Sequence, residues 1–390
     1  LRGRLVQLGM LGLLLNLSEG KKNTNTGRIQ AAQALARVLI STNPGLLPDA
    51  QLHDCIAPLV FLARVLEAPP PNMLKKSAST GGAQGTSFDA HTGSVSLQRF
   101  EACLALTNLA SHGAATQRIL IAAGALGALE SLQFDRNALV RRAATEGITN
   151  LATTDAGRAV IAQRSLSLWC ALASAYWEDE VTAIAAAGGL AMATATQYDL
   201  SEREVKSEGV HWVASAEEAA ANETALHDAG RQAARAVLAG DGVKSMAGAL
   251  LSGIADLQHR ALVVLRNLLY VPGGAEALSG AVAIDISFAQ EGESPQAAEG
   301  AESKDGAAAV PSADTSSQST VEVVPIALLA AMAQGAELPS WTQLQQEEKA
   351  GGTPTGTQQT TSPVLKQLAG AICDIVKAQL QDAGNPAGYV

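Results

Sequence analysis

Several features that mark common protein classes are scarce in this 390-residue sequence. Aromatic residues make up only 3% of it, and the alternating β-branched and aromatic runs typical of strands are rare. No run approaches about 18 apolar residues, so the sequence predicts no membrane-spanning helix. It starts without Met and without a charged-then-apolar leader, so we expect no signal peptide and interpret the chain as part of a longer protein.

Positive charge is also in short supply, and the net charge is −10. Proteins that bind nucleic acids usually carry a basic stripe. The Lys pairs at 21–22 and 75–76 instead lie in stretches rich in Gly, Asn and Ser, which are typical of solvated loops. The sequence therefore favours no nucleic-acid partner.

Metal-binding and catalytic motifs are missing too. The cysteines are far apart in apolar helical contexts, which predicts buried free thiols in a reducing cytoplasm: Cys55, Cys103, Cys170 and Cys373. No HExxH, GxSxG, P-loop or dinucleotide fingerprint occurs, and GGTPTG at 351–356 is typical of a linker because no helix start follows it. We expect no cofactor, no metal and no enzyme activity.

What the sequence does contain is a repeat. Similar segments recur along the chain, and Asn108, Asn150 and Met192 hold equivalent places in three of them. The interval from each of these residues to the next is the same, about 42 residues. The interval from Met192 to Asn267 is longer and equals one more period plus an insertion of about 33 residues. Helical armadillo and HEAT repeats are roughly 40–47 residues long, so the period is typical of them.

One period divides into a short, a medium and a long helix, at 116–123, 125–134 and 138–153. Gly124 separates the first two, and Asp135 and Asn137 can cap the third. The third helix has apolar positions at near-helical spacing: Leu139, Ala143, Ile148 and Leu151. This order predicts an all-α, armadillo-type right-handed α-solenoid. Expected core residues are Leu106, Leu109, Ile148, Leu151, Leu190, Leu265 and Leu268.

The organisation along the chain follows from this repeat and from composition. We expect armadillo-like repeats over 1–281, with insertions at about 69–95 and 198–228. A disordered linker rich in Gly, Ser, Ala and Glu is expected at 282–320. Terminal helices are expected over 321–381, with a polar linker at about 336–361, and a tail follows at 382–390.

In such an array the third helices line a continuous inner groove. Asn108, Asn150 and Asn267 would stand one above another there. An Asn amide both donates and accepts hydrogen bonds, so it can pair with the backbone of an extended peptide. The alternative is that these amides cap or bridge neighbouring turns within the scaffold. In the first repeat Arg37 is nearer this position than Asn16, which lies on the expected second helix.

Charged residues on the third helix at 138–153 complete the candidate groove. Arg142 and Glu146 are four positions apart and can pair on one helical face. Arg141 points elsewhere and could contact an acidic partner.

The repeats resemble a known family, the UCS domain of myosin chaperones. The similarity lies in motifs in the family's order: 30–48 (QAAQALARVLISTNPGLLP), 98–111 (QRFEACLALTNLAS), 140–153 (VRRAATEGITNLAT), 185–195 (AAAGGLAMATA) and 257–269 (LQHRALVVLRNLL). It covers residues 4–280 and, more weakly, extends to 381.

This resemblance implies a cytoplasmic armadillo-like domain that binds the motor domain of myosin heavy chain and assists its folding or assembly. In animal members an N-terminal tetratricopeptide domain recruits heat-shock protein ninety, and the sequence printed above contains no such domain. A generic armadillo scaffold that binds an extended segment of another protein is the alternative function.

Overall fold

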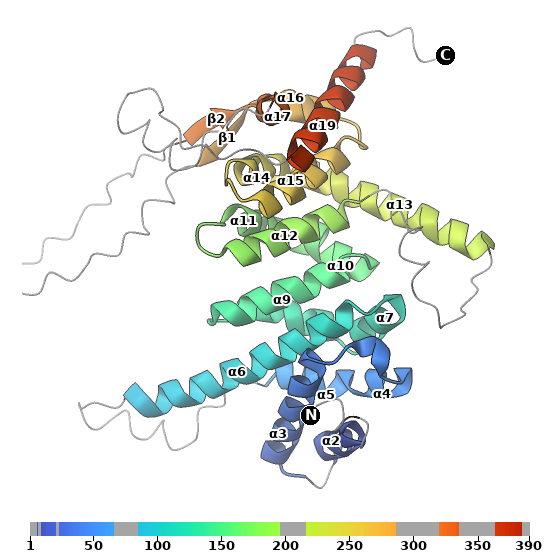
Figure 1. Ribbon diagram of the computed structural model, residues 1–390, viewed down its shortest axis with the longest axis vertical. Helices are drawn as coiled ribbons and strands as arrows, with labels where there is room; N and C mark the ends of the chain where they lie inside the picture. The colour runs from blue at the N-terminus through green and yellow to red at the C-terminus, as the bar shows by residue number, and fades with distance from the viewer. Residues whose placement is uncertain are drawn as a thin grey trace, which may run out of the picture.

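The computed structural model describes residues 6, 9–20, 23–65, 85–195, 216–285, 320–334 and 363–383. Within these residues the chain is almost entirely helical, and the helices stack along one long axis (Figure 1). Helix α2 (Met10–Glu19) lies at one end of the stack and α19 (Pro363–Ala383) at the other. The predicted all-α solenoid is confirmed.

The stack is organised around the last helix of each repeat, here called the third helix. Each third helix packs against the next one along the axis. In the described part of the chain they are α3 (Asn25–Ile40), α6 (Gly85–Ala110), α9 (Ala138–Leu151), α12 (Glu180–Ala193), α15 (Ala255–Leu268) and α19.

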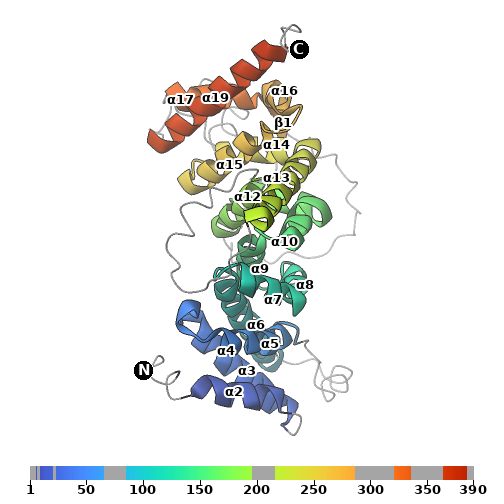
Figure 2. The same ribbon diagram turned by 90° about the vertical axis from the view of Figure 1, so that its right-hand side faces the viewer.

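Two further layers complete the repeats. Each second helix packs against the third helix of its own repeat. The second helices are α2, α5 (Ile56–Ala63), α8 (Ala125–Leu132), α11 (Leu166–Ser174), α14 (Gly242–Leu250) and α17 (Pro325–Gln334). First helices precede all of these except α2, and their lengths vary widely: α4 (Asp49–Asp54), α7 (Ala114–Ala122), α10 (Asp155–Ala159), α13 (Ala216–Ala239) and α16 (Gly274–Ser279). Figure 2 shows this succession from the side. A 3₁₀ turn, Pro44–Leu46, precedes α4, and a π-helical turn, Val160–Arg164, follows α10.

Local sequence explains where the helices of the central repeat begin and end. Gly124 has φ +79° and separates α7 from α8, a left-handed conformation that favours glycine. The side chain of Asn137 accepts a hydrogen bond from the Leu139 amide and so caps α9. The Asp135 carboxylate accepts from the Asn137 amide. The predicted breaks at Gly124 and at Asp135–Asn137 are confirmed.

The core runs the length of the stack between the layers. Every core residue predicted from the repeat is fully buried at 0% exposure: Leu106, Leu109, Ile148, Leu151, Leu190, Leu265 and Leu268. Leu139 was expected on the same apolar face, but its exposed fraction is 48%. It lies about three turns before the partly exposed Asn150, on the same face of α9, so its expected burial is wrong.

The chain also contains a two-stranded antiparallel sheet, which the sequence did not predict. Strand β1 (Val282–Asp285) pairs with β2 (Thr320–Val323), with Val282 opposite Val323. The expected disordered linker at 282–320 is therefore wrong at both ends. Strand β2 alternates polar and apolar residues, but β1 begins with three apolar residues in a row, and four residues give too short a pattern to recognise. Ile284 is buried in β1, which packs against α14.

The predicted insertions lie partly within helices. Helix α6 begins at Gly85, inside the range 69–95, and α13 begins at Ala216, inside the range 198–228. Nearly all of the remainder of these ranges lies outside the described residues, as do the polar linker after 336 and most of the tail.

The four cysteines are buried and free, as predicted. Burial raises the pKa of the Cys170 thiol to about 11 and those of Cys55 and Cys103 to about 12, so these thiols are protonated at neutral pH. Across the described ranges, no helix is both long and apolar enough to cross a membrane. In the same ranges, no group of three His, Cys, Asp or Glu residues is placed to hold a metal ion.

Candidate protein-binding face

The stacked third helices place Asn108, Asn150 and Asn267 in successive layers, as the repeat predicts. The side-chain amide of Asn108 donates to the carbonyl oxygens of Leu39 and Thr42, at 2.8 and 3.0 Å. Both acceptors lie at the C-terminal end of the preceding third helix, α3, whose last carbonyls have no partner within the helix.

The other two asparagines repeat this arrangement. The Asn150 amide donates to the Thr107 carbonyl in α6, at 3.1 Å. The Asn267 amide donates to the Ala191 carbonyl and to the Thr194 hydroxyl at the end of α12, both at 3.1 Å. Each asparagine therefore ties its helix to the preceding third helix.

These bonds change what the asparagines can contribute to a groove. Asn267 is only 2% exposed, so its expected place on an open groove is wrong. Asn108 and Asn150 are partly exposed. No donor among the described residues reaches the Oδ1 atom of either, so an acceptor remains on each for a bound segment.

The threonines just before two of these asparagines provide bonds in the opposite direction. The Thr107 hydroxyl donates to the Ala143 carbonyl of α9 at 3.1 Å, and the Thr149 hydroxyl donates to the Ala185 carbonyl of α12 at 2.9 Å. Sequence reasoning missed these residues. Their signal is the Thr-Asn dipeptide, which recurs at the period of the repeat.

Glycines at equivalent positions allow this close packing. A Cβ on Gly147 would lie 2.9 Å from the Thr107 hydroxyl. A Cβ on Gly189, one period later, would lie 2.5 Å from the Trp169 ring and 3.1 Å from the Thr149 hydroxyl. Trp169 is fully buried and cannot move aside.

We therefore expect Gly189→Ala to lower the free energy of unfolding by about 1–3 kcal/mol, the usual cost of overpacking a core. Gly127→Ala in α8 is the matched control, because nothing lies within 4 Å of a Cβ there. That control should be neutral or should stabilise by about 0.4–1 kcal/mol. Urea unfolding measures both variants, and equal effects would contradict the close contact.

Arg37 lies on the accessible side of the first two third helices. Its guanidinium contacts the Glu101 carboxylate at 2.7 Å, and the Gln33 amide donates to the same carboxylate at 2.8 Å. The Arg37 side chain remains 54% exposed. It can therefore contact a partner while paired with Glu101.

Arg142 pairs between repeats instead of within its helix. Its guanidinium donates to the Asp179 carboxylate at 2.7 and 3.3 Å, and the expected pair with Glu146 is wrong. Asp179 attracts Arg142 because this carboxylate is already fixed as the cap of α12. Burial raises the pKa of the Glu146 carboxyl. The positive charge of Arg142 lowers this pKa, and the negative charge of Asp179 raises it, so the net shift is upward.

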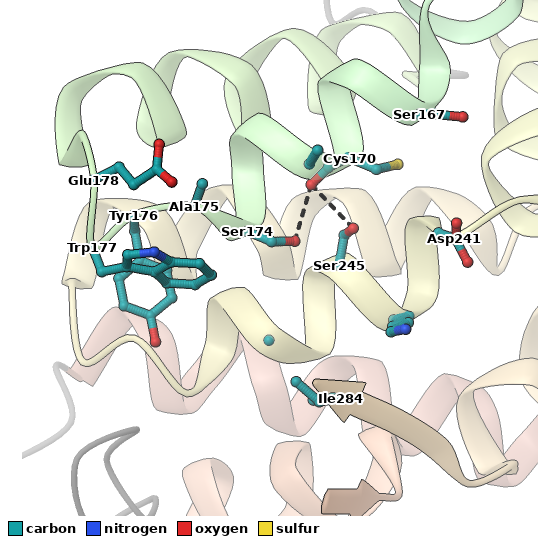
Figure 3. A pocket seen from close by; sticks show the side chains of 13 residues that line it. Ser167, Cys170, Ser174, Ala175, Tyr176, Trp177, Glu178, Asp241, Ser245 and Ile284 are labelled. Atoms are coloured by element: carbon teal, nitrogen blue, oxygen red, sulfur yellow. Dashed lines mark hydrogen bonds between the residues drawn. The ribbon is translucent and has the colours of Figure 1, made fainter. Parts of the chain in front are cut away.

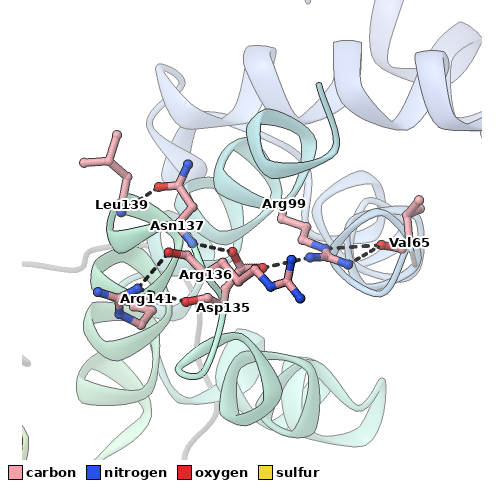
Figure 4. A network of polar contacts seen from close by, with 7 residues as sticks. All are labelled: Val65, Arg99, Asp135, Arg136, Asn137, Leu139 and Arg141. Carbon is pink, nitrogen blue, oxygen red and sulfur yellow. Dashed lines mark hydrogen bonds and ion pairs between the residues drawn. The ribbon is translucent and has the colours of Figure 1, made fainter. Parts of the chain in front are cut away.

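Arg141 also has partners within the scaffold. Its guanidinium donates to the backbone carbonyls of Asp135 and Arg136, at 2.9 and 3.0 Å, so it braces the loop before α9 (Figure 4). In the same network Arg99 pairs with Asp135 at 2.8 Å and donates to the Val65 carbonyl. The expectation that Arg141 points away toward an acidic partner is wrong for this guanidinium.

Asp179 gives the stack a pH-dependent contact. Partial burial acts to raise its pKa, but hydrogen bonds from Arg142 and Thr182 outweigh burial and hold the pKa below the ordinary value of 3.8. A carboxyl whose pKa is lowered by folding stabilises the protein above its unfolded pKa. That contribution is lost as the pH falls through the folded pKa.

Accordingly, Asp179→Asn should unfold more easily than the parent at pH 7, by about 1 kcal/mol. The difference should shrink as the pH falls below 3.8. The control is Asp155→Asn, because the Asp155 side chain is 86% exposed and its pair with Arg158 spans 3.8 Å. Urea unfolding between pH 7 and pH 3 provides the measurement, and a gap independent of pH would contradict the ion pair.

A cavity of about 400 Å³ lies between α11, α14 and β1 (Figure 3). The hydroxyls of Ser174 and Ser245 both donate to the Cys170 carbonyl, and Tyr176 and Trp177 lie at one end. No histidine is among its lining residues, and both of these serine hydroxyls already donate to the backbone.

Comparison with known proteins supports the resemblance seen in the sequence. No family model matches the chain. It is 28% identical over 185 residues to unc-45 homolog B of Xenopus tropicalis, covering 47% of this chain and 17% of that protein. It is 27% identical over 201 residues to the human protein of the same name, covering 51% of this chain and 18% of that protein.

The fold agrees with these relatives. UNC-45 from Drosophila melanogaster superposes with a TM-score of 0.55 at 18% identity, covering 97% of this chain and 33% of that one. The chain thus spans a third or less of each of these three UNC-45 proteins. Over about half of its length the chain is similar in sequence to unc-45 homolog B, and its fold is similar to that of a UNC-45 protein.

Proposed function

We propose that this chain is the protein-binding module of a myosin-directed chaperone, which holds a segment of the myosin motor domain while it folds or assembles. The observation that carries the proposal is the similarity to unc-45 homolog B over about half of the chain. The UCS resemblance of the repeats implies the same client. In this proposal the chain acts by binding and has no catalytic role.

The stack supports this role because it offers a long and rigid face. Asn, Thr and Arg side chains bond one third helix to the next, so the spacing between layers is fixed before a client binds. A surface that is already ordered loses little conformational entropy on binding. A client segment would contact Arg37, Arg142, Glu146 and the free Oδ1 atoms of Asn108 and Asn150.

The remaining parts of the proposal concern partners and location. We place the module in the cytoplasm. We propose no nucleic-acid partner, because the net charge of the chain is negative. Recruitment of heat-shock protein ninety would require a tetratricopeptide domain, which the sequence printed above does not contain.

A binding measurement with purified proteins tests the proposal. The immobilised chain is exposed to a panel of myosin motor domains, with actin as the unrelated control. We expect at least one motor domain to bind. Charge reversal by Arg37→Glu should weaken this binding, and the variant should keep its helical circular dichroism. If the folded chain binds no motor domain and captures other proteins instead, the generic armadillo scaffold replaces this proposal.

A further inference from the structure

One exposed apolar position recurs with the period of the repeat. Leu97, Leu139 and Val181 each stand one period apart, and their exposed fractions are 45%, 48% and 42%. They occupy equivalent places on α6, α9 and α12, which pack in succession. Scattered exposed apolar residues are normal, but the same exposure at three equivalent positions forms a continuous row. We call these three residues the edge ladder.

The edge ladder stops at α12 and has aromatic neighbours. The equivalent position on α15, one period and the insertion after Val181, is the exposed Asp256, so the row stops at α12. Phe134, 72% exposed, and Trp177, 38% exposed, lie just before α9 and α12. Figure 4 shows Leu139 projecting away from the polar network at its base, and Figure 1 shows the three helices one above another.

Charge changes sign along the row. Arg136 precedes α9, and it is exposed without a carboxylate partner among the described residues. Beside it, a hollow of about 710 Å³ is lined by Arg64, Arg99, Asp135 and Phe134 among others. At the last layer Glu178 and Glu180 lie between Trp177 and Val181 in the sequence, and both are exposed. The middle layer of the edge ladder therefore favours acidic groups, and the last layer favours basic groups.

The spacing of the row selects the shape of the occupant. Neighbouring packed helices have axes about 8–10 Å apart. Seven residues of an α-helix rise about 10.5 Å, and two turns bring a side chain back to nearly the same face. In a strand, residues on one face repeat about every 6.8 Å, which does not match one layer. A helix with apolar residues at i, i+7 and i+14 matches all three layers.

We propose that the edge ladder is a docking surface for one amphipathic helix of a partner protein. This helix lies along the solenoid axis, with three apolar residues at heptad spacing. Its acidic middle lies over Arg136, and its basic end lies over Glu178 and Glu180. Leu139 precedes Arg142 and Glu146 by three and seven residues, so the edge ladder borders the candidate groove on the same helix face. The inference rests on the proposed function as a binding module but not on myosin as the client.

Synthetic helical peptides, each three heptads long, test this proposal by fluorescence anisotropy. The heptad probe carries Leu at i, i+7 and i+14, with Glu around the middle Leu and Lys around the last. The shifted probe has the same composition, but its middle Leu is moved by two positions, which turns it about 200° around the helix. The reversed probe exchanges the Glu and Lys positions.

We expect the parent chain to bind the heptad probe more tightly than either of the others. Leu139→Asp should weaken binding about tenfold or more, because the change removes the burial of one leucine side chain. Val364→Asp is the matched control: Val364 is 61% exposed on α19, far from the edge ladder. It should leave the affinity unchanged.

Three results would overturn the proposal. The first is that the heptad probe does not bind the parent. The second is that the shifted probe binds as well as the heptad probe, which would exclude the register. The third is that Leu139→Asp, with the parent's melting temperature, binds the heptad probe as tightly as the parent does.

Discussion

Replacing Asn108, Asn150 and Asn267 together by alanine should lower the free energy of unfolding by roughly 3–6 kcal/mol. The three amides donate five hydrogen bonds to preceding layers. Each such bond typically contributes about 0.5–1.5 kcal/mol, and a buried carbonyl left unpaired costs more. The sites lie in different repeats, so their effects should be nearly additive. Urea unfolding followed by circular dichroism measures the change.

Asn16→Ala is the matched control for this triple variant. Asn16 is an exposed asparagine on the second helix α2, and its side chain donates to no carbonyl among the described residues. The control should unfold like the parent. A triple variant as stable as this control would mean that the amides do not hold the layers together, and a role in recognition alone would then explain their spacing.

Trp169→Ala should destabilise the protein more than any other single substitution proposed above, by about 3–5 kcal/mol. Trp169 is fully buried in α11, and its ring lies against Gly189 of α12, where no Cβ fits. Removing the ring leaves a cavity beside this glycine. The Gly189→Ala change should therefore cost less in the Trp169→Ala background than in the parent, because the cavity accommodates the new methyl group.

A double-mutant cycle on Trp169 and Gly189 measures this coupling. We expect the double variant to be more stable than the sum of the two single changes predicts, by about 1 kcal/mol or more. Strictly additive effects would contradict the close contact between ring and glycine, and the loss in Gly189→Ala would then need another cause.

Much of the fold follows from the repeat in the sequence. Asn108 and Asn150 stand at one repeat's separation, and the leucines around them are buried because the helical phase is the same in each layer. Gly124 and Asn137 mark helix boundaries by local conformation and capping, which the sequence alone can indicate. These properties depend on neighbours close in the chain or on strict periodicity.

Contacts between repeats were harder to predict. Arg142 pairs with Asp179 of the next layer instead of Glu146 on its own helix, and nothing in the spacing indicates which carboxylate is nearer. Whether the Asn amides bridge two layers or bind a partner depends on where the preceding third helix ends in space. The spacing of residues in the sequence does not give that position. Leu139 fits the helical period but lies on the face of α9 that carries the partly exposed Asn150, and no described residue covers it fully.

The most direct test of the proposed function is protection of a myosin motor domain from heat aggregation. Light scattering is recorded during heating, with this chain at equimolar concentration or with bovine serum albumin as the control protein. We expect the chain to suppress scattering and to preserve the motor's ATPase activity after cooling, with Arg37→Glu less effective. Equal aggregation with the chain and with the control, for every motor domain in the panel, would contradict a myosin-directed chaperone.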